Sequence, residues 1–141
     1  MDKACPVVLR NRENQLEILA FRHPLAGTQL VKGTIEPGEA SFAASQRELF
    51  EEAGITLKAK DQLLKWQRRP DEPIWDIWVM EPGDHLPDCW DHYCEDDGGR
   101  LFHYFWHPLS LSTDSEWHPV FVDALTAIRE TIVNTQHWRV K

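Results

Sequence analysis

The chain has 141 residues, of which 42% are hydrophobic and 27% are charged, and its formal net charge is −8. This length predicts one domain, residues 1–141, with a core of its own. The composition is that of an ordinary soluble protein, and no apolar run approaches the ~20 residues of a membrane span. The negative charge argues against broad nucleic-acid binding, which requires a basic surface. Because the N-terminal apolar stretch is too short for a signal peptide and the three cysteines fit reduced thiols, we expect a cytoplasmic protein.

Strand and helix signals alternate along the chain and predict a small α/β domain. The expected strands are residues 4–10, 15–22, 29–31, 62–69, 74–80 and 101–106. A helix is expected over residues 40–53, because no Gly or Pro interrupts this stretch and Gly54 follows it, and Ser41 is the expected N-cap. A closing helix over residues 119–134 begins with Pro119, and apolar residues repeat through it at helical spacing.

The segment 33–55 has the pattern G-x5-E-x7-R-E-U-x-E-E-x-G-U, in which U is an aliphatic residue. Every specified position is filled, by Gly33, Glu39, Arg47, Glu48, Leu49, Glu51, Glu52, Gly54 and Ile55. At average residue usage this pattern would occur by chance in roughly fewer than one in ten million chains of this length. Glycine at the start of the pattern lets the backbone approach a ligand closely, so the segment is a candidate ligand site.

An advance of ~100° per residue divides the side chains of the expected helix into two arcs. Glu48, Glu51 and Glu52 share one arc, where each like-charge pair opposes the helix by roughly 0.2–0.5 kcal/mol. The opposite arc is apolar and is expected to face the core; it contains Phe42, Ala43, Gln46, Leu49, Phe50 and Ala53. Three glutamates alone would more often form a solvated acidic face. The glycine turn before the helix favours instead a hard divalent cation, which takes carboxylate and phosphate oxygens.

With these residues the segment resembles the Nudix box. The resemblance implies an α/β fold of the Nudix type, an α/β/α sandwich with a mixed sheet between helices. It also implies a site for Mg²⁺ or Mn²⁺ formed by Gly33, through its carbonyl group, and by Glu39, Glu48, Glu51 and Glu52. Arg47 is expected to pair with a helix carboxylate and hold it in position. Glu51 and Glu52 are the expected principal ligands, while Glu48 is a ligand or acts on the attacking water; the general base is left unassigned.

The segment 81–100 is the least regular part of the sequence and is expected to be a long loop that contacts the substrate. Its aromatic residues Trp90 and Tyr93 are candidates for stacking on a base. Many Nudix enzymes take a further metal ligand or base from beyond the box. Candidates for that role are Glu95, Asp96 and Asp97, although each acid taken singly is more often solvated.

Two arginines outside the box are candidates for contacts with a phosphate group, because a guanidinium can form paired hydrogen bonds. Arg22 lies just before the box and Arg68 ends an expected strand. A zinc site at Cys89 and Cys94 fits only loosely, since no second ligand pair follows at a set distance.

These expectations favour a metal-dependent pyrophosphohydrolase that cleaves the diphosphate linkage of a nucleoside diphosphate joined to another group. Its partners would be small nucleotide or nucleotide-sugar-like molecules, with no membrane, and a homodimer is left open. A modified nucleoside triphosphate or a dinucleoside polyphosphate is an alternative substrate. A non-catalytic nucleotide sensor is an alternative of another class, but such a domain would have little need of three helix carboxylates.

Overall fold

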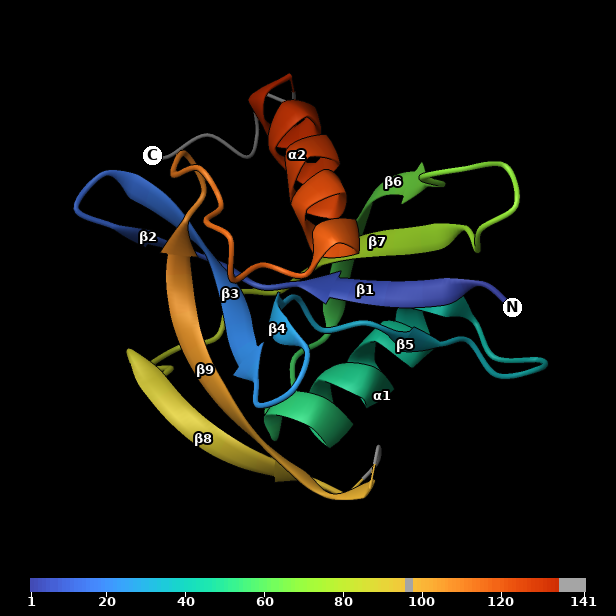
Figure 1. Cartoon of the computed structure of the whole chain (residues 1–141), viewed down its shortest axis with the longest axis horizontal. Coiled ribbons are helices and arrows are strands. Elements are labelled where there is room, and N and C mark those ends of the chain that lie inside the picture. Colours follow the sequence, from blue (N-terminus) through green and yellow to red (C-terminus); the bar gives the residue numbers. More distant parts are fainter. Residues whose placement is uncertain (96–97, 135–141) are drawn as a thin grey trace.

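The computed structural model describes residues 1–95 and 98–134, and within them two sheets lie between two helices (Figure 1). The first sheet has the order β5 (Gly33–Thr34), β1 (Lys3–Val7), β7 (Trp75–Met80), β6 (Ala59–Trp66). It is mixed, because β1 and β7 are parallel and its other pairs are antiparallel. The second sheet is antiparallel, with the order β2 (Leu9–Arg12), β3 (Gln15–His23), β9 (Arg100–Pro108), β8 (Cys89–Cys94), and β4 (Gly27–Gln29) pairs with β3. The expected α/β fold with a mixed sheet between helices is confirmed.

The helices α1 (Ser41–Ala53) and α2 (Pro119–Val133) pack on different core clusters. In β3, Ile18 and Ala20 join the cluster under α2, whereas Leu19 and Phe21 join the cluster under α1. Because side chains alternate along a strand, β3 supplies both cores and has no polar face between these residues. No described helix combines the length and the apolar character needed to cross a membrane.

The first expected strand, residues 4–10, is divided in the structure. β1 ends at Val7 and β2 begins at Leu9, and the two strands belong to different sheets. Pro6 lies inside β1 and not at this division, so the sequence does not mark where the first strand ends. The hairpin turn between β2 and β3 consists of Glu13 and Asn14 alone, with φ angles of 52° and 65°, whereas the expected strands left four residues, 11–14, between them.

The expected loop over residues 81–100 is wrong in its second half. Residues 89–94 form β8, which pairs along its whole length with β9. Exposed Cys89, Asp91 and Tyr93 alternate with more buried side chains, so Asp91, the acidic residue of this strand, lies on the solvent face of an edge strand. The expected strand over residues 29–31 is wrong, because β4 ends at Gln29 and β5 begins at Gly33. The other expected strands and the closing helix hold with shifted ends; β6, for example, begins at Ala59.

The boundaries of α1 agree with the expected helix, but its cap and its buried face do not. Ala40 is the N-cap residue, and the Ser41 hydroxyl instead accepts a hydrogen bond from Trp78 Nε1 at 3.0 Å. Gly54 ends the helix with a φ of 76°, where its N–H donates to the Phe50 carbonyl. The expected apolar arc is wrong at Phe42 and Phe50, which are 47% and 58% exposed.

The buried face of α1 consists of Ala44, Ser45, Glu48, Leu49 and Ala53. Small side chains at the start of this face let the helix lie close to the strands, and a charged residue, Glu48, is included in it. Hydrophobic periodicity predicts that Phe42 and Phe50 face the core. In the structure, steric fit determines which side of this helix is buried.

Candidate metal and active site

Arg47 lies at the centre of an acidic cluster formed by Glu39, before α1, and by the glutamates of α1, Glu48, Glu51 and Glu52. Its Nε and Nη2 atoms donate to the two carboxylate oxygens of Glu39 at 2.8 and 2.9 Å. Its Nη1 atom donates to Glu48 Oε1 at 2.8 Å and to Glu51 Oε1 at 2.9 Å. Nη2 also donates to the Thr34 carbonyl at 2.9 Å. The expected contact of Arg47 with a helix carboxylate is therefore present twice, and the same guanidinium ties the preceding loop to the helix.

Glu39 is held in its ionised form. The hydrogen bonds from Arg47, followed by one from the Glu36 N–H at 3.0 Å, lower the pKa of Glu39 to about 2. The pairing raises the pKa of Arg47, chiefly through the same bonds to Glu39. A two-bond fork between guanidinium and carboxylate is among the strongest side-chain pairs, so Glu39 holds Arg47 in position.

Gly33 and Glu48 lie against each other. Glu48 is only 8% exposed, and a Cβ atom built on Gly33 would collide with its carboxylate. Any residue with a side chain at position 33 would displace the carboxylate, which gives the first glycine of the pattern a steric reason. The backbone at Gly33 and the Glu48 oxygens thus form a narrow cradle.

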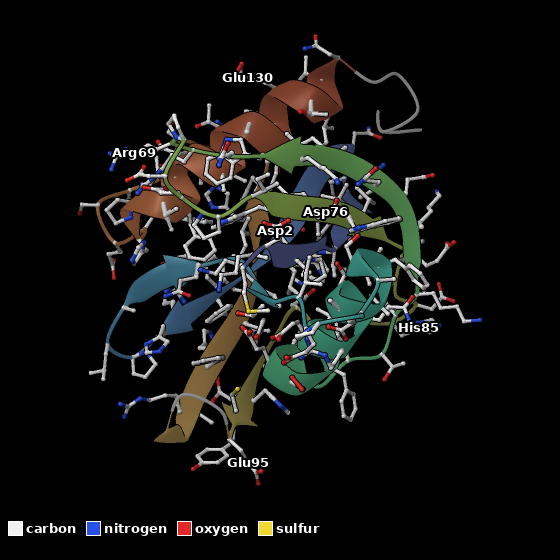
Figure 2. All side chains as sticks on the ribbon, turned by 90° about the vertical axis from the view of Figure 1, so that its right-hand side faces the viewer. Asp2, Arg69, Asp76, His85, Glu95 and Glu130 are labelled. Atoms are coloured by element: carbon white, nitrogen blue, oxygen red, sulfur yellow. The ribbon has the colours of Figure 1, made fainter. Side chains whose placement is uncertain are left out.

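Glu51 and Glu52 lie on the part of α1 that approaches β8 and β9. Glu51 lines a cavity of about 390 Å³ together with Phe50, His92, Tyr93 and Glu95. Figure 2 shows Glu95 at the end of β8. The backbone carbonyl of Glu52 accepts a hydrogen bond from the Tyr104 hydroxyl at 2.8 Å, which fixes the last turn of the helix on β9.

The residues of the cluster fit a hard divalent cation. Their donors are all oxygen atoms, which suit Mg²⁺ and Mn²⁺. The carboxylates of Glu48 and Glu51 already converge on one positively charged nitrogen, Arg47 Nη1. Within the described ranges no three His, Cys, Asp or Glu side chains are gathered as a finished metal cage. A cation would therefore recruit oxygens that Arg47 now holds.

Arg22 and Arg68 lie apart from this cluster. The Arg22 guanidinium is 4.3 Å from the centroid of the Phe105 ring, in a cavity of about 180 Å³ near Trp117. Arg68 forms a fork with Glu72 and lies 3.6 Å from Asp123 of α2. The neighbouring Arg69 lies beside α2, away from α1 (Figure 2). Arg68 lines a separate cavity of about 570 Å³, and no described residue of α1 lines this cavity or the one beside Arg22.

Trp90 and Tyr93 are on β8 rather than in a loop, and they point to different sides of it. Trp90 stacks on Tyr104 with ring centroids 5.2 Å apart, and its Nε1 donates to the Ala53 carbonyl at 3.0 Å. Tyr93 is 59% exposed and lines the same cavity as Glu51. One expected aromatic residue therefore packs on the end of α1, and the other lies beside the acidic cluster.

Of the three acidic candidates, Glu95 lines the cavity with Glu51, while Asp96 and Asp97 lie outside the described residues. The two cysteines considered for zinc do not converge: Cys89 is exposed and Cys94 is buried, and five residues along a strand separate them to opposite faces.

Sequence reasoning missed two residues that contact the backbone of the cluster, and a lysine directly before the box. Tyr104 and His92 contact the backbone of Glu52 and Glu51, from strands about forty to fifty residues away. Lys32 lies directly before Gly33. Its pKa is lowered, chiefly because burial disfavours the charged form of the side chain. A lysine between an apolar residue and the first glycine of the box is a signal that the sequence does contain.

The sequence model of the NUDIX domain matches residues 2–125. The chain belongs to this family. Nudix hydrolases generally use divalent metal ions, in agreement with the oxygen-rich cluster. No curated protein matches the chain in sequence.

Several solved structures share the fold. NrtR of Shewanella oneidensis, crystallised with a 27mer DNA, has 14% identity and a TM-score of 0.59, and the match covers 94% of this chain and 62% of NrtR. An ADP compounds hydrolase has 21% identity and a TM-score of 0.63, covering 98% of this chain and 76% of that one. The Ap4A hydrolase of C. elegans has 20% identity and a TM-score of 0.59, covering 94% and 96%. The chain thus spans about three fifths of the length of NrtR, and at these identities the likeness establishes the fold alone.

Proposed function

We propose that the chain is a Nudix pyrophosphohydrolase that uses Mg²⁺ or Mn²⁺ to cleave the diphosphate linkage of a nucleoside diphosphate joined to another group. The observation that carries the proposal is the convergence of Glu39, Glu48 and Glu51 on Arg47, next to the cradle at Gly33. The ADP compounds hydrolase and the Ap4A hydrolase, which share the fold, support a nucleotide substrate.

In this mechanism Glu48, Glu51 and Glu52, with the Gly33 carbonyl, would hold the cation. The cation supplies Lewis-acid chemistry, offsetting charge on phosphate oxygens and increasing the acidity of water. Arg47, held by Glu39, would keep the carboxylates of Glu48 and Glu51 in position when their oxygens bind the cation. One of the helix glutamates would accept the proton of the attacking water.

The group beyond the diphosphate would be selected outside the box, because the box contacts only phosphate and metal. Tyr93 is the best supported of the expected substrate residues, since it lines the cavity of Glu51. Trp90 would stack on a base through the face of its ring that is not covered by Tyr104. Arg22 and Arg68 would contact only a substrate long enough to leave this cavity.

A panel assay tests the function directly. Purified protein is incubated with Mg²⁺ or Mn²⁺ and several dozen nucleotides, and the release of nucleotide or phosphate is measured. We expect hydrolysis of a nucleoside diphosphate derivative, loss of turnover with EDTA, and its return when Mg²⁺ is restored in excess. Preference for a nucleoside triphosphate or for Ap4A would change the substrate class. Tight nucleotide binding with no turnover on the whole panel would contradict the enzyme and support the sensor.

A further inference from the structure

The last turn of α1 ends in carbonyl groups that the helix itself does not use. An α-helix leaves its last four carbonyls without partners inside the helix. In α1 the first of these four, the Phe50 carbonyl, accepts a hydrogen bond from the Gly54 N–H at 3.0 Å. The other three belong to Glu51, Glu52 and Ala53. The groups that hold these three carbonyls therefore also hold the backbone of two proposed metal ligands.

Each of the three carbonyls accepts a hydrogen bond from a different side chain of the second sheet, whose strands β8 and β9 pass beside this end of α1 (Figure 1). The contacts are His92 Nε2 to Glu51 at 3.2 Å, the Tyr104 hydroxyl to Glu52 at 2.8 Å, and Trp90 Nε1 to Ala53 at 3.0 Å. Because a carbonyl oxygen only accepts, His92 carries a proton on Nε2 in this arrangement. The last turn thus has one side-chain donor for each carbonyl that the helix leaves unused.

The register of β8 and β9 brings the three donors together. Trp90 and His92 are two positions apart on β8 and share one face, and Tyr104 lies directly opposite Trp90 on β9. The His92 ring lies against Gly54, where an added Cβ atom would be 2.7 Å from His92 Nδ1. The glycine at position 54 therefore makes room for the His92 ring, in addition to ending the helix with a positive φ.

The position of the last turn matters for the metal site because the proposed ligands lie on two successive turns of α1. Glu48 is packed against Gly33, whereas Glu51 and Glu52 lie closer to the end of the helix. Helix ends fray, and fraying of this end would move Glu51 and Glu52 away from Glu48. The last turn of α1, which the structure describes in full, contains no basic side chain of its own. Neutral donors from the second sheet hold it instead.

We propose that His92 and Tyr104 are positioning residues of the metal site, which hold the last turn of α1 so that Glu51 and Glu52 reach the same cation as Glu48. In this role each acts through a backbone carbonyl and needs no contact with the metal. Contacts of this kind around metal ligands typically change metal affinity by 10- to 100-fold. The inference rests on the proposed function for the identity of the metal site, and both residues lie outside the Nudix pattern.

The first test is a calorimetric titration with Mg²⁺, without substrate, on wild type, Tyr104→Phe and the control Trp106→Phe. Tyr104→Phe removes only the hydroxyl, and Mg²⁺ should bind about 10-fold more weakly. Trp106 is on the same strand and in the same core cluster, but its Nε1 donates to the Pro87 carbonyl at 2.9 Å, outside α1. Trp106→Phe should lower the melting temperature at least as much, because it loses a hydrogen bond and ring volume. Its Mg²⁺ affinity should stay within about twofold of wild type.

A pair of substitutions at position 92 separates the hydrogen-bond donor from the bulk of the ring. His92→Leu removes the donor, and Mg²⁺ should bind about 10-fold more weakly. His92→Gln keeps an N–H donor and should recover most of this loss. A residue that only fills space would give no such recovery. Trp90 is left out of the test, because it is also a candidate for stacking on a base.

Three results would overturn the proposal: Mg²⁺ affinity within about twofold of wild type in Tyr104→Phe or His92→Leu, an equal loss in Trp106→Phe, or no recovery in His92→Gln. Wild type that binds no Mg²⁺ would overturn it too. If Tyr104→Phe does not fold, the pair at position 92 decides by the same criteria. Because no turnover is measured, a silent nucleotide panel with donor-dependent Mg²⁺ binding would remove the enzyme and keep these positioning residues. Hydrolysis with unaltered Mg²⁺ binding in the variants would do the reverse.

Discussion

The acidic cluster of α1 and the strand β8 meet at the same end of the molecule, but different forces hold them. In the cluster, Arg47 bonds to residues one to thirteen positions away along the chain, and every bond involves a charge. In β8, Trp90 and His92 bond to carbonyl groups of α1 that are 37 and 41 positions away, and Trp90 adds a ring stack. The contrast indicates that charged contacts between residues close in sequence position the carboxylates. Packing between residues far apart in sequence holds α1 against the sheet.

The largest effect should come from a charge change inside the cluster. Glu52→Gln keeps the shape of the side chain and removes a carboxylate. Turnover should fall by about 10² or more, as when one preorganised electrostatic group is lost. The matched control is Glu130→Gln, the same change at an exposed position of α2 (Figure 2), which should leave turnover unchanged. Steady-state kinetics with a melting curve checks both; a folded Glu52→Gln enzyme with full turnover would show that the charge of Glu52 is dispensable.

Two neighbouring residues of α1 test its packing. Leu49 is fully buried and Phe50 is 58% exposed. Leu49→Ala should lower the free energy of unfolding by roughly 2–5 kcal/mol. Phe50→Ala should change it by no more than about 0.5 kcal/mol, as for other surface substitutions. Urea unfolding of the two variants measures the difference, and a larger loss in Phe50→Ala would mean that the helix is rotated from the face described.

A smaller effect is expected from the long-range contact of β8. Trp90→Phe retains a ring to stack on Tyr104 but removes the donor to the Ala53 carbonyl. The free energy of unfolding should fall by about 1 kcal/mol, the usual contribution of one hydrogen bond. Unfolding and the Michaelis constants for a nucleotide and a base-free diphosphate are measured together. Unchanged stability with a raised constant for the nucleotide alone would assign Trp90 to the substrate instead.

The mildest expected effect is the acid response of the cluster. The pKa of Glu39 is lowered from 4.5 to about 2, chiefly by Arg47. A carboxyl group with a lowered pKa stabilises the fold fully above its unfolded value, and this contribution is lost as the pH falls through its folded value. The stability advantage of wild type over Glu39→Gln should therefore be constant above pH 5 and shrink between about pH 4.5 and 2. Denaturant unfolding over this range tests the sign; an advantage that grows on acidification would contradict the pairing.

The family resemblance of the box was sufficient to predict the contact of Arg47 with a helix carboxylate, whereas the fork between Arg47 and Glu39 is found only in the structure. Contacts within a helix depend on helix geometry over one or two turns, which residue spacing encodes directly. The pairing of β8 with β9 and the burial of Trp90 against Ala53 depend on where distant segments come together, and hydrophobic periodicity does not report this. Phe50 was misplaced because periodicity ranks side chains by hydrophobicity, while the close approach of α1 to its strands selects Ala44 and Ser45.

The position of Arg47 affects whether the chain must bind a metal ion before it can fold. In a zinc finger the metal supplies the folding energy, so synthesis and metal loading are one event. Here the Arg47 guanidinium already forms ion pairs with Glu39, Glu48 and Glu51, which reduces the repulsion among these carboxylates. We therefore expect the chain to fold before it binds a metal ion. Under the proposed metal-dependent function, removal of the metal would stop turnover without unfolding the chain, and resupply of the metal would restore turnover without new synthesis.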